Sequence, residues 1–133
     1  MQQRVLGIGG IFIKAKDPKA LQAWYIKHLG LPVTPDGYIV FQHKESDGAG
    51  YAVWSAFPEN TTYTEPSKKP FMVNFRVANL DELLAVLKAE GVTIVGEPEH
   101  LEYGKFGWIL DPEGNKIELW ESIDAEFKKM NKM

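Results

Sequence analysis

Glu118 is an acid inside a strand-like stretch that otherwise has a buried character. The turn Asp-Pro-Glu-Gly-Asn (111–115) precedes this stretch, and Ile117 and Leu119 flank the acid. Carboxylates are rarely fully buried without a partner, because removing the charge from water is costly. The pattern therefore leaves four roles for Glu118: a metal ligand, a substrate contact, one half of a salt bridge, or a solvated side chain.

The sequence lacks the residues and motifs that several kinds of chemistry require. There is no cysteine, which excludes disulfides, thiolate metal sites and cysteine nucleophiles. No Gly-x-Ser-x-Gly stretch is present, and Gly-Ile-Gly-Gly belongs to a strand instead of opening a helix, so it is not a nucleotide-binding loop. The three histidines are not at the spacing of a metal site; they are His28, His43 and His100.

The composition is that of an ordinary globular domain. The chain has 133 residues, of which 44% are hydrophobic and 25% charged, and its net charge is −3. A negative balance without a basic patch argues against nucleic acid and anionic membranes as partners. No stretch approaches the roughly 20 apolar residues of a membrane span, and no secretion signal is present, so we expect a cytoplasmic protein.

The elements that must position Glu118 occur twice along the chain. In the first half, Val5–Ala15 is a predicted strand whose glycines allow close approach on one face. Asp17 and Pro18 then begin a helix, as its N-cap and first helical residue, and Gly30 ends it. Two strand-like runs follow, joined by the hairpin-like Glu-Ser-Asp-Gly-Ala-Gly. The helix carries an apolar stripe at i, i+3, i+4 and i+7, formed by Leu21, Trp24, Tyr25 and His28.

The second half repeats this order. Phe71–Val77 is a predicted strand, Asn79 caps a helix with a leucine stripe, and Gly91 ends that helix. Three further strands are predicted over 92–95, 106–111 and 116–122. We therefore predict a single domain built from two βαβββ modules. Its parts are module 1 (about 5–57), a polar linker (58–70), module 2 (about 71–122) and a solvated tail (123–133).

The doubled pattern resembles the vicinal oxygen chelate superfamily of glyoxalases, bleomycin-resistance proteins and dioxygenases. The resemblance rests on DPKALQAWYIKHLGLPV in the first half, and on NFRVANLDELLAVLKAEGVTIVGEPE and GKFGWILDPEGNKIELWE in the second. The Asp-Pro-x-Gly-Asn turn followed by Ile-Glu-Leu is its most specific part. It implies an α+β fold in which two βαβββ modules form curved mixed sheets around a shared cleft. It also implies a homodimer.

The resemblance also indicates where a metal would bind. In metal-dependent members each module supplies two ligands, and carried over residue by residue these fall at Gly10, Trp54, Met72 and Glu118. Only Glu118 is a suitable ligand for a hard or borderline cation. We therefore expect no metal site and no cofactor, with a divalent metal disfavoured. The missing side chain at Gly10 is expected to leave space for a guest.

The remaining cleft residues follow from strand alternation, starting at the positions given by the resemblance. Trp54 is expected to offer a stacking face, and Asn74 an amide that contacts a ligand or ties two strands together. Glu118 is the candidate catalytic acid or base, with a salt bridge to Lys14 or Arg76 as the open alternative. The predicted ligand-binding residues are Phe12, Lys14, Trp54, Asn74, Arg76 and Trp120.

Two classes of function fit these expectations. The first is a glyoxalase/bleomycin-resistance-like protein that binds a small, partly apolar molecule in the inter-module cleft without the family's usual metal. The alternative is a lyase, an isomerase or a dioxygenase-type enzyme that uses Glu118 as a metal ligand or a metal-free general base. An anionic group on the ligand would face Lys14 or Arg76.

Overall fold

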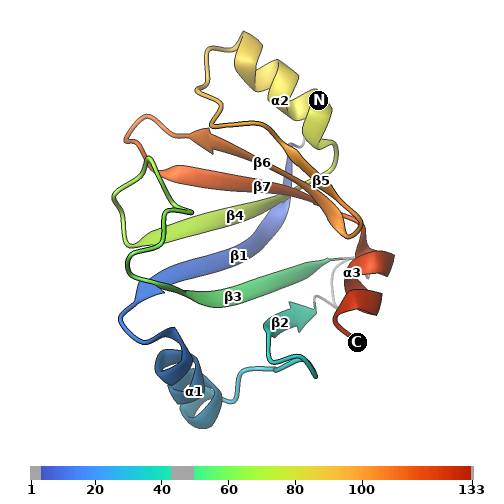
Figure 1. Cartoon of the computed structure of the whole chain (residues 1–133). Coiled ribbons are helices and arrows are strands. Elements are labelled where there is room, and N and C mark those ends of the chain that lie inside the picture. The colour runs from blue at the N-terminus through green and yellow to red at the C-terminus, as the bar shows by residue number, and fades with distance from the viewer. Residues whose placement is uncertain (1–3, 43–49, 133) are drawn as a thin grey trace.

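The structure is a computed structural model that describes residues 4–42 and 50–132. The predicted turn over 45–50 lies outside this range except for Gly50, and so does His43. Module 1 consists of β1 (Val5–Ala15), α1 (Pro18–Leu29), β2 (Ile39–Gln42) and β3 (Tyr51–Pro58). Module 2 consists of β4 (Phe71–Val77), α2 (Leu80–Ala89), β5 (Glu99–Leu101), β6 (Gly104–Leu110) and β7 (Lys116–Ser122). A last helix, α3 (Asp124–Met130), follows (Figure 1).

In the described part of the chain, seven strands form one mixed sheet in the order β2-β3-β1-β4-β7-β6-β5. The two modules meet where β1 and β4 pair in antiparallel fashion, and each module repeats one parallel pairing, β1 with β3 and β4 with β7. Figure 1 shows the sheet curving between α1 and α2. The predicted α+β fold with paired modules is confirmed, and the two modules share one continuous sheet.

Both long helices begin and end at the predicted signals. Asp17 Oδ1 accepts a hydrogen bond from the Ala20 amide at 3.1 Å, and Asn79 Oδ1 accepts one from the Glu82 amide at 3.1 Å. Gly30 ends α1 in the left-handed region, at φ 63°, where a side chain would be strained. The caps satisfy amide groups that the first helical turn leaves without partners.

We expect Asn79→Ala to lower the free energy of unfolding by about 1 kcal/mol, the usual cost of losing a side-chain N-cap. Urea unfolding followed by circular dichroism would measure this loss. Asn60→Ala is the matched control, because Asn60 lies on an exposed turn between β3 and β4. Equal effects of the two substitutions would contradict the capping role.

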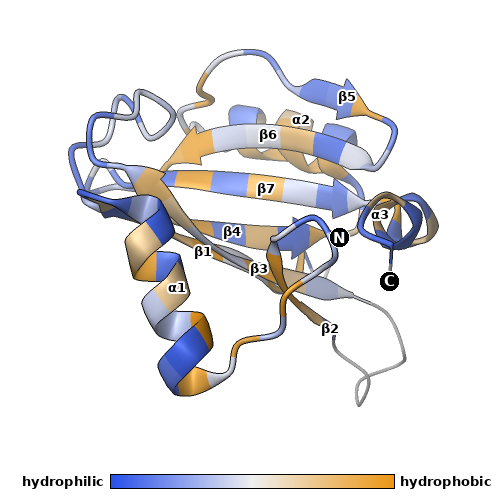
Figure 2. Cartoon of the chain, turned by 60° about the horizontal axis from the view of Figure 1, so that its bottom comes forward, coloured by the Kyte–Doolittle hydropathy of each residue, from blue (hydrophilic) through white to orange (hydrophobic). Residues whose placement is uncertain are grey.

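The helices and the sheet enclose two apolar clusters. One lies under α2, where Leu80 and Leu83 are buried against Val77 and Leu119. The other joins the two modules and α3, and its buried members are Val40, Tyr51, Trp120 and Phe127. Figure 2 shows alternating hydrophilic and hydrophobic bands along β7, as expected for a strand whose two faces meet different surroundings.

Three local predictions differ from the structure. The run 92–95 forms only an isolated bridge between Ile94 and Ile109, since the left-handed glycines Gly91 and Gly96 bracket it closely. The short strand β5 was not among the predicted strands. The tail is not simply solvated, because Phe127 of α3 is 6% exposed and packs against Tyr51 and Trp120. No described helix is long and apolar enough to cross a membrane.

Candidate functional site

Glu118 is buried near the middle of β7, with 3% of its surface exposed. The turn before β7 sets its position: Asp111 accepts hydrogen bonds from the amide and the side chain of Asn115, and Gly114 takes φ 81°. Hydrogen bonds from Asn115 hold the pKa of the Asp111 carboxyl below its usual range. This turn fixes the pairing of β6 with β7, in which Trp108 stands opposite Glu118.

Three neutral donors satisfy the Glu118 carboxylate. Asn74 Nδ2 donates to Oε1 at 2.7 Å, and Trp108 Nε1 donates to Oε2 at 2.9 Å. The Tyr63 hydroxyl also donates to Oε2. The expected salt bridge to Lys14 or Arg76 is therefore not what stabilises this acid in the described structure. Uncharged hydrogen-bond donors do so instead, which is the other way to bury a charge.

Two strand pairings and one loop bring these donors together. Asn74 of β4 lies beside Glu118 in the parallel β4–β7 register, and Trp108 lies beside it in the antiparallel β6–β7 register. Tyr63 comes from the predicted linker, which folds back so that the tyrosine ring contacts Trp108 edge-on at 6.2 Å between ring centres. Lys116 Nζ lies 5.2 Å from the centre of the Tyr63 ring and donates to the Tyr63 carbonyl. Burial lowers the pKa of Lys116.

The Tyr63 hydroxyl is a hydrogen-bond donor whose pKa lies above the usual range for tyrosine. Burial, followed by the nearby charge of Glu118, raises its pKa. A raised folded-state pKa contributes stability that is present below the unfolded value of about 10 and is lost as the pH rises above it.

We expect Tyr63→Phe to lower the free energy of unfolding by about 1 kcal/mol at pH 7, through loss of one hydrogen bond. Above about pH 10 the difference between the wild type and the variant should shrink, because only the wild type must keep this hydroxyl protonated to stay folded. Denaturant unfolding at pH 7, 9 and 10.5 measures both effects. A difference that grows with pH would contradict the assignment.

A cavity of about 260 Å³ opens beside Glu118. Both modules and α3 contribute to its walls. Phe106 and Trp120 lie parallel, with ring centres 5.9 Å apart, and form one aromatic wall. The other lining residues are Gly9, Phe12, Tyr38, Val40, Val53, Asn74, Tyr103, Glu118, Phe127, Met130 and Asn131. A mostly apolar cavity with a few polar groups is the usual form of a small-molecule site.

The structure brings four of the seven predicted site residues together around this cavity: Phe12, Asn74, Glu118 and Trp120. Lys14 lies on the same face of β1 as Phe12, but it is at the end of the strand and does not line the cavity. Space for a ligand was expected at Gly10, but the glycine that lines the cavity is Gly9. Beside Gly10 the space is filled, because an added Cβ would lie 2.9 Å from the Val53 carbonyl oxygen.

Trp54 lies on the opposite face of the sheet from the cavity. The parallel register pairs Gly10 with Val53 and Ile11 with Trp54, so Val53 takes the place on the cavity side. The Trp54 ring packs against Tyr25 of α1 instead, with 4.5 Å between ring centres. A shift of one residue in the carried-over position is enough to move a strand side chain to the other face.

Arg76 is buried on the cavity side of β4 but reaches past the cavity. Its Cγ lies against Gly9, and its guanidinium lies against Gly50, where an added Cβ would be 1.9 Å from Nη1. The glycines of β1 were predicted to allow close approach on one face of the strand. At Gly9 the side chains that approach are those of Asn74 and Arg76.

Sequence reasoning missed several residues of the site. Trp108 could have been found, because counting outward from the turn at 111–115 places it opposite Glu118. Tyr63 carries no such local signal, since the fold alone returns the linker to the sheet. The same holds for Phe127 and Met130, which α3 brings to the cavity.

The residues present do not fit the metal that the family resemblance implies. Of the four carried-over positions, Gly10 has no side chain, Met72 is buried, and Trp54 faces α1. Both oxygens of Glu118 already accept hydrogen bonds. Across residues 4–42 and 50–132, no group of three or more His, Cys, Asp or Glu side chains is placed to hold a metal ion. His28 and His100 are both exposed, on α1 and β5.

Two modules joined through their first strands, with a cavity between them, define a glyoxalase-like fold of the vicinal oxygen chelate superfamily. The sequence agrees: residues 10–120 match the Glyoxalase-like domain family, and the chain belongs to it. No curated protein matches the chain.

Solved structures of the same fold are distant in sequence. Methylmalonyl-CoA epimerase from Mycobacterium tuberculosis is 22% identical, with a TM-score of 0.64 over 96% of this chain and 95% of that one. The Streptomyces coelicolor methylmalonyl-CoA epimerase in complex with 2-nitronate-propionyl-CoA is 19% identical, with a TM-score of 0.67 over 90% and 99%. A glyoxalase/bleomycin resistance protein/dioxygenase superfamily member from Vibrio splendidus is 14% identical, with a TM-score of 0.57 over 86% and 97%.

Proposed function

We propose that this chain binds a small, partly apolar molecule in the cavity between its modules, without a metal at Glu118. The observation that carries the proposal is the composition of the cavity wall. Aromatic and aliphatic side chains from both modules and α3 surround a polar end formed by Glu118 and Asn74. Such a wall removes an apolar ligand from water, and the polar end fixes its orientation.

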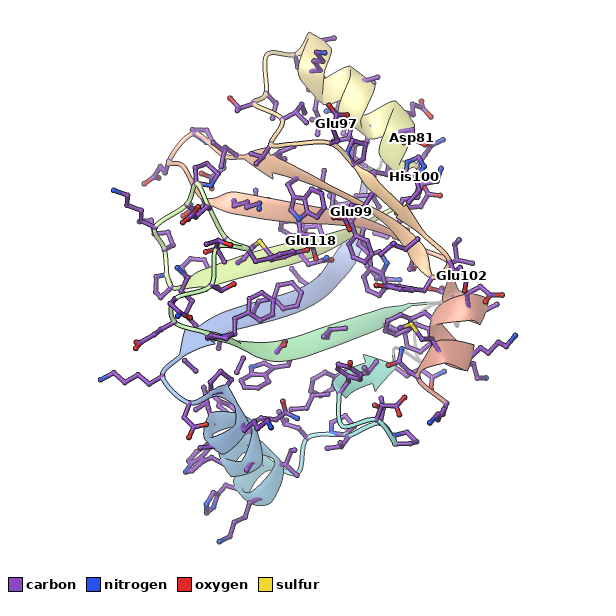
Figure 3. The ribbon with its side chains drawn as sticks, in the orientation of Figure 1. Asp81, Glu97, Glu99, His100, Glu102 and Glu118 are labelled. Carbon is purple, nitrogen blue, oxygen red and sulfur yellow. The ribbon has the colours of Figure 1, made fainter. Side chains whose placement is uncertain are left out.

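The position of Glu118 supports recognition of a bound molecule. Its carboxylate is held in one orientation by Asn74, Trp108 and Tyr63, which come from three different segments. A side chain fixed in this way presents the same oxygen to every ligand, and little ordering is needed on binding. Figure 3 shows Glu118 near the centre of the sheet, away from the exposed pair Asp81 and His100.

Filling the cavity tests the proposal. We expect Val53→Trp to weaken the binding of small ring compounds by at least about tenfold, because the larger side chain occupies the space of the ligand. Because Trp120 lines the cavity, tryptophan fluorescence reports binding. Calorimetry measures the same binding independently.

Val33→Trp is the matched control, since Val33 is 44% exposed and does not line the cavity. Binding that survives in Val53→Trp and falls in Val33→Trp would place the ligand elsewhere. Failure of every compound in a panel of neutral, cationic and anionic ring compounds to bind the wild type would overturn the proposal.

A further inference from the structure

The polar end of the cavity offers acceptors to a ligand. Within residues 4–42 and 50–132, Glu118 Oε2 accepts two hydrogen bonds, whereas Oε1 accepts only the one from Asn74. Each carboxylate oxygen can accept about two, so Oε1 retains room for another donor. Asn74 Oδ1 is a second acceptor, buried and without a hydrogen-bond partner among the residues that the structure describes.

The Asn74 amide cannot turn round to offer a donor instead. Its Nδ2 donates to Glu118 at 2.7 Å, and the reversed amide would place one oxygen against another. Oδ1 is therefore held at the cavity wall beside Gly9, where an added Cβ would lie 2.1 Å from it. A buried acceptor left without a donor costs free energy that a ligand's N–H group can recover.

Acidic side chains lie at and near the cavity. Among the described residues that line it, Glu118 is the charged one. Glu99 stands opposite Phe106, which stands opposite Trp120, so Glu99 lies on the same face of the sheet as Glu118 (Figure 3). Burial, followed by Glu99 and Glu118, raises the pKa of Tyr103 at the wall.

The nearby cations are directed elsewhere. Lys116 Nζ bonds the Tyr63 carbonyl, and the Arg76 guanidinium lies against Gly50. Neither lines the cavity. From the sequence, an anionic group of the ligand was expected to face Lys14 or Arg76. In the cavity such a group would meet the Glu118 carboxylate, because neither Lys14 nor Arg76 lines the wall.

The aromatic wall suits a cation as well. Phe12, Phe106 and Trp120 line the cavity, and Tyr38 and Tyr103 add two more aromatic residues to its wall. The face of an aromatic ring attracts a positive charge, and the attraction is stronger where water is excluded.

From these contacts we infer that the ligand is an apolar or aromatic molecule carrying a protonated amine, which donates to Glu118 Oε1 and Asn74 Oδ1 while its body lies against the Phe106–Trp120 wall. This inference rests on the proposed function and specifies its ligand class. The ammonium group supplies the counter-charge that the three neutral donors of Glu118 do not.

Matched compounds that differ only in the polar group test the ligand class. Calorimetry would compare phenethylamine, 2-phenylethanol and phenylacetate, and likewise tryptamine, tryptophol and indole-3-acetate, with the wild-type protein at pH 7. We expect each amine to bind at least about tenfold more tightly than its alcohol, since hydrogen bonds to charged groups are the stronger ones. We expect each carboxylate to bind most weakly.

The outcomes separate the two proposals. If alcohols or carboxylates bind as tightly as the amines, the cavity is a binding site and the ligand class is overturned. If none of the six binds, the proposed function itself falls. Val53→Trp should weaken the binding of all of them by at least about tenfold, and undiminished amine binding in that variant would place the amine outside the cavity and overturn the inference.

Glu118→Gln should reduce the preference for amine over alcohol to about threefold or less, because it removes the charge and keeps an acceptor. Glu113→Gln, on the exposed turn before β7, is the matched control and should leave the preference unchanged. A full preference in a folded Glu118→Gln chain would overturn the role of Glu118. The wild-type comparison alone decides the ligand class if this variant does not fold.

Discussion

Glu118→Ala is expected to lower the free energy of unfolding by about 3–5 kcal/mol, because removing the shared acceptor of a buried hydrogen-bond network leaves its donors unsatisfied. The substitution leaves Asn74 Nδ2 and Trp108 Nε1 buried without an acceptor, and each such group costs about 1–3 kcal/mol. The Tyr63 hydroxyl loses its acceptor too. Urea unfolding at pH 7 measures the loss.

Glu113→Ala is the control for this experiment. Glu113 is an exposed acid five residues earlier, on the turn that precedes β7, and its replacement should change stability by no more than about 0.5 kcal/mol. A loss below about 1 kcal/mol in Glu118→Ala would mean that water or a rearranged side chain satisfies the freed donors. The network would then not hold β4, β6 and β7 together.

Features written in short stretches of the sequence were predicted correctly. Asp17 and Asn79 cap their helices as expected, because a side-chain cap involves residues only three positions apart. The same is true of the turn at 111–115, whose residues hydrogen-bond to one another. The repeat of such signals in both halves was enough to predict the paired modules.

The site could be predicted only where strand parity was known. Glu118 and Trp120 lie on β7, whose register with β6 is fixed by the turn just before it, and both line the cavity. In module 1 no turn within the described residues fixes β3, and the carried-over position was one residue away from Val53. Because strand side chains alternate, an error of one residue placed Trp54 on the wrong face.

Contacts between residues far apart in the sequence could not be predicted from local sequence patterns. Tyr63 is 55 positions from Glu118 in sequence and lies in a polar stretch typical of a linker. Phe127 sits in a lysine-rich tail, where a single aromatic residue gives no periodic signal. Both residues find their partners through the packing of the folded sheet, which sequence spacing does not encode.

Gly9→Ala is the second substitution expected to have a large effect, a loss of about 2–3 kcal/mol from overpacking. Gly9 lies on β1 beside β4, at an irregularity in their antiparallel register, and an added Cβ would be 2.1 Å from Asn74 Oδ1 and 3.0 Å from Arg76 Cγ. The Asn74 side chain cannot move aside cheaply, because its Nδ2 bonds Glu118. The strain is therefore expected to reach the site as well as the sheet.

Gly7→Ala, on the same strand, is the matched control, since its added Cβ would lie 3.4 Å from the nearest atom, Arg76 Nη2, and should cost no more than about 0.5 kcal/mol. A double-mutant cycle with Asn74→Ala identifies the cause. If the conflict is with Asn74, Gly9→Ala should cost clearly less in the Asn74→Ala background than in the wild type. An unchanged cost would shift the conflict to Arg76, and the Asn74–Glu118 pair would then be independent of the close approach between β1 and β4.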